Sequence, residues 1–256
     1  MENAILKAED LELSFGALKA VDKVSLSLGP DELFSLVGPN GSGKTCILNM
    51  LSGVYKTDSG KITYQGEDIT NLPPYKIAAM GLARSCQMVE LFSHMTVLDN
   101  LLLGCHAQMH DNLFSCGIYW GFAQKVELSF RRWVEEIIDF FEIERYRKQL
   151  VVNLPFGVQK LVGVARALAM KPKVVLLDEP SSGMNRQEKE DLARFLLRIR
   201  YTLKIPIIWV EHDIKMVSDL SDRIAVLHSG RKIAEGNPEE VFSSPEVTKV
   251  YTAGTA

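Results

Sequence analysis

A short loop with the sequence Gly38-Pro39-Asn40-Gly41-Ser42-Gly43-Lys44-Thr45 follows a run of apolar residues. It fits the pattern G-x-x-x-x-G-K-[ST], known as the P-loop. Glycines let successive backbone N–H groups point at phosphate oxygens, and the helix that follows adds roughly half a positive charge at its N-terminus. Lys44 supplies a full charge for the β- and γ-phosphates, and Thr45 offers a hydroxyl to Mg²⁺. We therefore predict a nucleotide-binding loop here rather than a plain glycine-rich turn.

The segments around the loop have the patterns of strands and a helix. Leu33–Val37 is a continuous apolar run, typical of a buried strand, and Lys44–Leu51 is a predicted helix. Residues 5–37 include alternating apolar and polar side chains, as in Leu11–Phe15, which predicts half-buried antiparallel strands. Lys61–Tyr64 is another short predicted strand. The loop is thus predicted to connect a buried strand to a helix, beside an antiparallel β region.

A second chemical pattern is an apolar run that ends in two acids, Val174-Val175-Leu176-Leu177-Asp178-Glu179. Carboxylates at the carboxyl end of a parallel strand lie where open α/β sheets bind ligands. We predict that Asp178 belongs to the Mg²⁺ shell and that Glu179 is the general base for an attacking water. Two solvated acids in a turn are the alternative, which the nearby P-loop disfavours. The predicted helix Gln187–Tyr201 and buried strand Pro206–Val210 complete a β-α-β order, which indicates a parallel sheet.

The middle of the chain has helical periodicity. Between Glu127 and Phe141, one apolar stripe is formed by Phe130, Val134, Ile137, Ile138 and Phe141. We predict a single domain over residues 1–256, in which residues 1–87 and 166–256 form an α/β core with a β subdomain. Residues from about 88 to 165 are predicted to form a helical subdomain inserted into it.

Composition excludes several classes of protein. The net charge is −3 and no Lys/Arg run is present, which argues against a nucleic-acid partner. The longest apolar runs are far shorter than the ~20 residues that span a bilayer, so any membrane role must come through a partner and we expect a cytosolic location. Four widely spaced cysteines are predicted to be reduced thiols rather than a disulfide or metal site: Cys46, Cys86, Cys105 and Cys116.

These motifs, in this order, resemble the ATPases of ABC (ATP-binding cassette) transporters, and more narrowly those of branched-chain amino acid importers. The resemblance covers nearly the whole chain. It implies an α/β P-loop NTPase fold, an ABC cassette with a RecA-like core, an antiparallel β subdomain and an inserted helical subdomain. It also implies a Mg²⁺-dependent ATPase coupled to transmembrane transport, with ATP and Mg²⁺ bound.

Further site residues follow from the resemblance. Phe15 occupies the place of the aromatic residue that stacks on adenine, with a buried core phenylalanine as the alternative. Gln87 matches the Q-loop glutamine, which touches Mg²⁺ or the attacking water. His212 matches the H-loop histidine that bonds the γ-phosphate, whereas a lone histidine is more often structural. Ser181–Asn185 matches the D-loop, which crosses to the other ATPase. The stretch Leu91–Leu101 resembles the importer subgroup.

One motif departs from the family pattern. Where the family carries L-S-G-G-Q, which caps the γ-phosphate bound by the opposite subunit, this chain has Leu154-Pro155-Phe156-Gly157-Val158-Gln159. Gly157 keeps the second glycine, whereas Pro155 removes a hydroxyl and an N–H, and Val158 replaces the usual Gln. The hypothesis is that this chain's own P-loop site is catalytically whole, and that its signature serves a weakened site on a partner.

The resemblance implies an ATPase subunit of an importer for branched-chain amino acids or similar small organic solutes. Its implied partners are integral-membrane permease subunits and a second ABC ATPase, with a heterodimer favoured over a homodimer by the altered signature. A substrate-binding protein is an indirect partner. The chain would then lie in the cytoplasm, on the inner face of the cell membrane. An exporter ATPase and a soluble, non-transport ABC ATPase are the alternatives.

Overall fold

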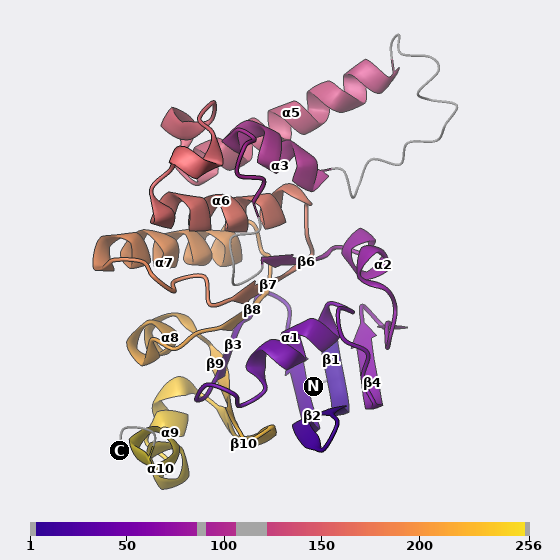
Figure 1. Ribbon diagram of the computed structural model, residues 1–256, viewed down its shortest axis with the longest axis vertical. Helices are drawn as coiled ribbons and strands as arrows, with labels where there is room; N and C mark the ends of the chain where they lie inside the picture. The colour runs from indigo at the N-terminus through magenta and orange to yellow at the C-terminus, as the bar shows by residue number, and fades with distance from the viewer. Residues whose placement is uncertain (1–3, 86–90, 106–121, 254–256) are drawn as a thin grey trace.

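The computed structural model describes residues 4–85, 91–105 and 122–253 (Figure 1). Their strands form two sheets. The larger is six-stranded, with the order β10-β9-β3-β8-β7-β6. Its strands are β3 (Leu33–Val37), β6 (Leu82–Ser85), β7 (Val174–Asp178), β8 (Ile207–Val210), β9 (Arg223–His228) and β10 (Arg231–Gly236). All neighbouring pairs are parallel except β9 with β10. Every residue of β3, β7 and β8 is buried, which explains their continuous apolar sequences.

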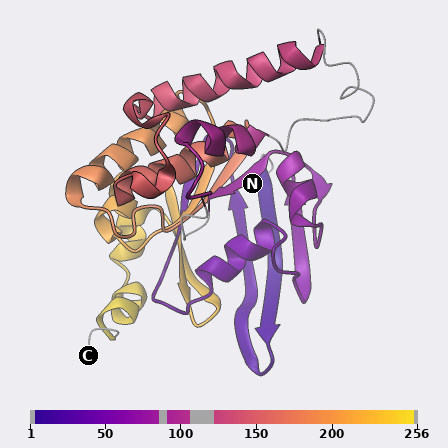
Figure 2. The same cartoon turned by 45° about the horizontal axis from the view of Figure 1, so that its top comes forward.

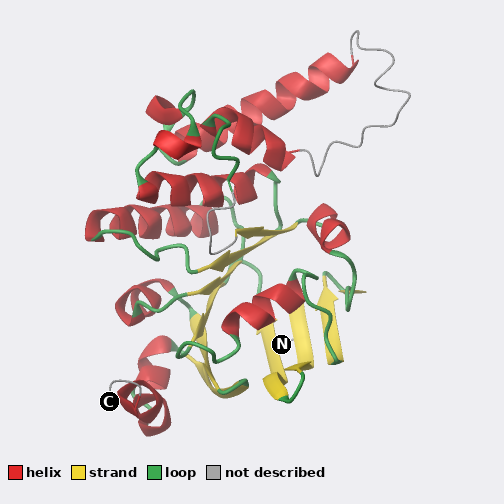
Figure 3. Cartoon of the chain, in the orientation of Figure 1, coloured by secondary structure: helices red, strands yellow, loops and turns green. Residues whose placement is uncertain are grey.

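The smaller sheet is antiparallel, with the order β2-β1-β4-β5. It comprises β1 (Leu6–Phe15), β2 (Leu18–Leu28), β4 (Ser59–Tyr64) and β5 (Glu67–Asp68). Helix α1 (Lys44–Leu51) lies beside both sheets, as Figures 1 and 3 show. Its Ile47 and Leu48 are fully buried in one core cluster with Val24 of β2 and Phe34 of β3. The P-loop helix is therefore anchored by both sheets.

Helices cover the opposite face of the parallel sheet. They include α3 (Val97–Cys105), α5 (Phe122–Phe140), α6 (Phe156–Ala169), α7 (Arg186–Tyr201) and α8 (Ile214–Leu220). In Figure 2, α3, α5 and α6 gather on one side of the molecule. The predicted stripe faces inward, since Val134, Ile137, Ile138 and Phe141 are buried in one cluster with residues of β7 and α7. The predicted boundaries near 88 and 165 remain a prediction, and α6 runs across the second.

The remaining helices are short, and two of them, the 3-10 turns η2 (Glu144–Tyr146) and η3 (Val151–Asn153), connect α5 to α6. The others are α2 (Pro74–Ala79), α9 (Pro238–Phe242) and α10 (Pro245–Ala253). Across the described ranges, no helix combines the length and apolar character needed to cross a membrane.

The sheet order brings three loops together. Strands β3, β8 and β7 are parallel neighbours, so their carboxyl ends lie at one edge of the sheet. Gly38 follows β3, Glu211 and His212 follow β8, and Glu179 follows β7. The predicted phosphate-binding loop, Glu179 and His212 therefore meet at this edge.

Candidate functional site

The loop of residues 38–45 joins β3 to α1 in a conformation that requires glycine. Gly43 has φ of 102°, in the left-handed region, and a Cβ atom there would lie 2.5 Å from the carbonyl oxygen of Ala20. The tip of the β9–β10 turn packs against the loop, since the Gly230 N–H donates to the Ser42 carbonyl at 3.1 Å. Strand β2 and the β9–β10 turn thus pack against the loop and support its curved backbone conformation, as the sequence pattern predicts.

The Lys44 ammonium lies over this loop and is buried. Its Nζ donates to the carbonyl oxygens of Gly38 at 2.8 Å and Pro39 at 2.9 Å. Burial lowers the pKa of Lys44, and the carboxylates of Glu179 and Asp178 oppose that shift. A partly desolvated cation is thereby held where the sequence predicts the phosphates of a nucleotide.

Thr45 and Asp178 come together although 133 residues separate them: Thr45 Oγ1 donates to Asp178 Oδ1 at 3.3 Å. A hydroxyl and a carboxylate oxygen suit Mg²⁺, which proteins commonly hold with one or two carboxylates together with substrate phosphates. The donor set therefore fits the predicted ion, which supplies positive charge to the phosphates when bound. Among the described residues, no cluster of three or more His, Cys, Asp or Glu offers a different metal site.

Arg84 is a site residue that the sequence analysis missed. Its Nη2 lies 3.0 Å from Asp178 Oδ2, and the two side chains are only 12% and 1% exposed. Arg84 also donates to Ser52 Oγ at 3.0 Å and to Asn49 Oδ1, which ties Asp178 to the end of α1. Burial raises the pKa of Asp178 and Arg84 opposes that shift. The strand that carries Arg84 has two apolar and two polar residues, so its sequence gives no sign that this arginine is buried and paired.

Glu179 and His212 form a close pair, with 2.6 Å between Glu179 Oε1 and His212 Nε2. The Glu179 backbone is in the left-handed region, with φ of 47°, which is uncommon for a non-glycine residue. Strained backbone of this kind concentrates at functional sites. The two residues predicted as general base and γ-phosphate contact are thus side by side.

Glu211, also missed, joins two predicted loops. It is 3% exposed. Its Oε1 accepts from the Ser181 N–H at 3.1 Å, and its Oε2 accepts from the His212 N–H at 2.8 Å. Charge-assisted bonds of this kind are stronger than neutral ones. Glu211 therefore fixes the start of the D-loop relative to the His212 backbone.

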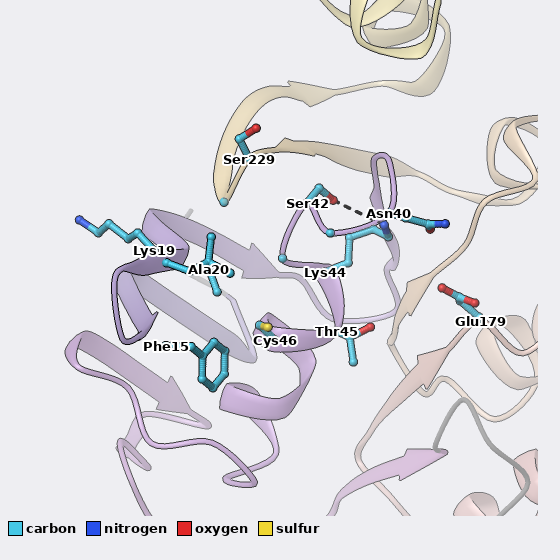
Figure 4. A pocket seen from close by; sticks show the side chains of 14 residues that line it. Phe15, Lys19, Ala20, Asn40, Ser42, Lys44, Thr45, Cys46, Glu179 and Ser229 are labelled. Atoms are coloured by element: carbon cyan, nitrogen blue, oxygen red, sulfur yellow. Dashed lines mark hydrogen bonds between the residues drawn. The ribbon is translucent and has the colours of Figure 1, made fainter. Parts of the chain in front are cut away.

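A pocket of about 490 Å³ lies over the loop. Its wall includes Phe15, Lys44, Thr45 and Glu179, and Figure 4 shows Phe15 and Glu179 on opposite sides of the loop. Phe15 is 48% exposed and its ring meets Tyr55 edge-on at 5.6 Å, so it is not the buried core phenylalanine of the alternative interpretation. An exposed ring at this end offers a stacking surface for a planar base.

The altered signature lies at the start of α6. Pro155 occupies the N-cap position, and Gln159 Nε2 donates to the Leu154 carbonyl at 2.9 Å. A Cβ atom on Gly157 would overlap the Glu188 carboxylate, which explains the glycine. The exposed Phe156 ring packs closely on Gly183 of the D-loop. None of residues 154–159 lines the pocket described above, and Gln87 lies outside the described residues.

A family model described as ABC transporter matches residues 21–182. The chain belongs to the ABC transporter family. It is 37% identical over 258 residues to the high-affinity branched-chain amino acid transport ATP-binding protein LivG of Escherichia coli K12, covering 98% of each chain. It is 33% identical over 256 residues to BraF of Pseudomonas aeruginosa, with the same name and coverage.

Solved structures agree with this assignment. A nucleotide-free ATP-binding cassette from an ABC transporter matches with a TM-score of 0.85 at 30% identity, over 97% of this chain and 98% of that one. The predicted fold is therefore confirmed: an ABC cassette with a parallel core sheet and an antiparallel β subdomain. This ABC cassette binds ATP and is the ATPase subunit that energises a transporter.

Proposed function

We propose that this cassette powers the import of branched-chain amino acids or similar small organic solutes through partner permeases. The observation that carries the proposal is the similarity to LivG and BraF over 98% of each chain, since both are named branched-chain amino acid transport proteins. The importer-like stretch Leu91–Leu101 supports the same interpretation over an exporter or a soluble ABC ATPase. Permease subunits would bind this cassette directly at the cytoplasmic face of the membrane, and a substrate-binding protein would contribute indirectly.

At the site, the proposed roles follow from chemistry. Phe15 stacks on adenine, and the backbone N–H groups of residues 38–45, with Lys44, bind the phosphates. Thr45, Asp178 and Gln87 hold Mg²⁺. Glu179 takes the proton of the attacking water. His212, whose Nε2 lies 2.6 Å from Glu179 Oε1, donates a hydrogen bond to the γ-phosphate.

Transport itself tests the proposed substrate class. The membrane complex containing this chain, reconstituted into proteoliposomes with its substrate-binding protein, is expected to accumulate labelled leucine, isoleucine or valine when ATP is present on the cassette side. Vesicles that hold the Glu179→Gln complex are the control for ATP-driven uptake. ATP-driven uptake of a chemically unrelated solute alone would overturn the substrate class, and ATP-driven efflux would overturn import.

We further propose that two cassettes bind two ATP molecules head to tail, and that the second cassette is an unlike ATPase. Pro155 and Val158 replace signature residues, which supports a weakened site on the partner's P-loop. This chain's own P-loop site would face the partner's signature and carry most of the turnover.

Pro155→Ser is therefore expected not to lower ATP turnover by the complex, because the signature of this chain serves the weaker site. Phosphate release at saturating ATP measures the effect. Pro245→Ser is the matched control, because it also removes an exposed proline from the start of a helix. A severalfold fall for Pro155→Ser alone would show that turnover depends on the altered signature as it stands.

A further inference from the structure

A buried lysine links the signature helix to the predicted base. Lys160 lies on α6, in the turn that follows the signature, and is 7% exposed. Its Nζ lies 3.4 Å from the carbonyl oxygen of Glu179. Lysine is almost never so buried unless its charge is compensated. Hydrophobic packing alone therefore does not explain why a charged ammonium is buried here.

Hydrogen bonds at both its N–H and its carbonyl hold the Glu179 backbone. Its N–H donates to the Val210 carbonyl at 3.0 Å, and its carbonyl accepts from the Ser182 N–H at 3.2 Å as well as from Lys160. Glu179 has φ of 47°, a conformation that costs a glutamate free energy unless its surroundings impose it. The direction of the Glu179 side chain depends on that backbone. Lys160 supplies a side-chain donor, whereas Ser182 contributes a backbone N–H and Val210 a backbone carbonyl.

The charge around Lys160 agrees with this role. Burial lowers the pKa of Lys160, and the carboxylates of Glu179, Glu211 and Asp178 oppose the shift. These acids lie at the carboxyl ends of β7 and β8, and the Lys160 ammonium offsets part of their negative charge. Nζ also lies 5.7 Å from the centre of the Phe156 ring in the signature. One cation thus lies between the Phe156 ring of the signature and the backbone carbonyl of Glu179.

We propose that Lys160 is a positioning residue for ATP hydrolysis, which holds the Glu179 backbone from the signature helix so that the carboxylate stays in place beside His212. This inference rests on the proposed role of Glu179 as general base. If the start of α6 meets the nucleotide of the second cassette, a shift of α6 reaches Glu179 through Lys160. The two ATP sites of the complex would then be linked by this side chain.

Lys160→Met tests the inference in the complex purified from membranes. We expect the turnover number to fall about 10-fold to 100-fold, because small displacements of a catalytic group cost about that much. The dissociation constant for a fluorescent ATP analogue should stay within about twofold, since Lys160 does not line the pocket. Lys160→Arg, which keeps the cation and its donors, should retain most turnover. Lys173→Met is the control for loss of an exposed lysine.

Unchanged turnover in Lys160→Met would overturn the inference. So would a parallel loss of turnover, nucleotide binding and thermal stability, because that pattern indicates a purely structural lysine. If Lys160→Met does not fold, Lys160→Gln takes its place, with a neutral amide and the same expected split between turnover and binding. The proposed role of Glu179 is tested separately by Glu179→Gln. Its expected loss of turnover does not depend on the results for the Lys160 variants.

Discussion

Replacing Glu179 with glutamine is expected to lower ATP turnover by about 10²-fold to 10⁴-fold, the range that a positioned general base contributes. Glutamine has nearly the same shape and its amide oxygen still accepts a hydrogen bond. We therefore expect it to keep the contact with His212, which is 2.6 Å long with glutamate. It cannot take a proton from water. Phosphate release by the purified complex measures turnover, and a fluorescent ATP analogue measures binding, which should persist.

The matched control is Glu67→Gln, which makes the same chemical change at an exposed residue of β5. It should leave turnover unchanged. Full turnover by the Glu179→Gln complex would remove Glu179 from the reaction. It would also contradict the proposal that this chain carries the more active of two ATP sites.

Arg84→Met is expected to lower the free energy of unfolding by about 3–5 kcal/mol, the usual cost of breaking a buried ion pair from one side. The Asp178 carboxylate, whose side chain is 1% exposed, would be left buried without its partner at 3.0 Å. Urea unfolding of the purified chain measures the change. Arg186→Met is the control, because that side chain is 91% exposed and its bond to Glu190 should contribute at most about 1 kcal/mol.

A double variant separates loss of the ion pair from loss of packing. Arg84→Met combined with Asp178→Asn removes both charges, so it should be more stable than Arg84→Met alone. If Arg84→Met is as stable as the natural protein, the pair does not compensate charge as its geometry indicates. If the double variant shows simple additive losses, the two residues act independently.

The sequence predicts the parts of the site that depend on local patterns. The P-loop, the buried strand Leu33–Val37 and the helix Lys44–Leu51 are found as predicted, because glycine spacing and apolar runs act within a few residues. The parallel order of β7 and β8, which end at Asp178 and Val210, also follows from the β-α-β pattern. The meeting of Thr45 with Asp178 is a consequence of that topology.

Contacts of a side chain with a residue far away in the sequence cannot be predicted from such local patterns. Arg84 meets Asp178 across 94 residues, and Glu211 meets Ser181 across 30. Each of these charged residues looks like an ordinary surface residue in the sequence, because its partner is brought close only when the strands assemble. The left-handed backbone of Glu179 was equally hidden, since glutamate has no preference for it.

The most direct test of the central claim is to tag this chain in its native cell, solubilise the membranes gently, and identify the proteins that co-purify. A cassette that energises an importer should bring down multi-span permease chains together with a second, unlike ABC ATPase. Recovery from the soluble fraction alone, with no membrane partner, would contradict the account and indicate an ABC ATPase that works away from a transporter.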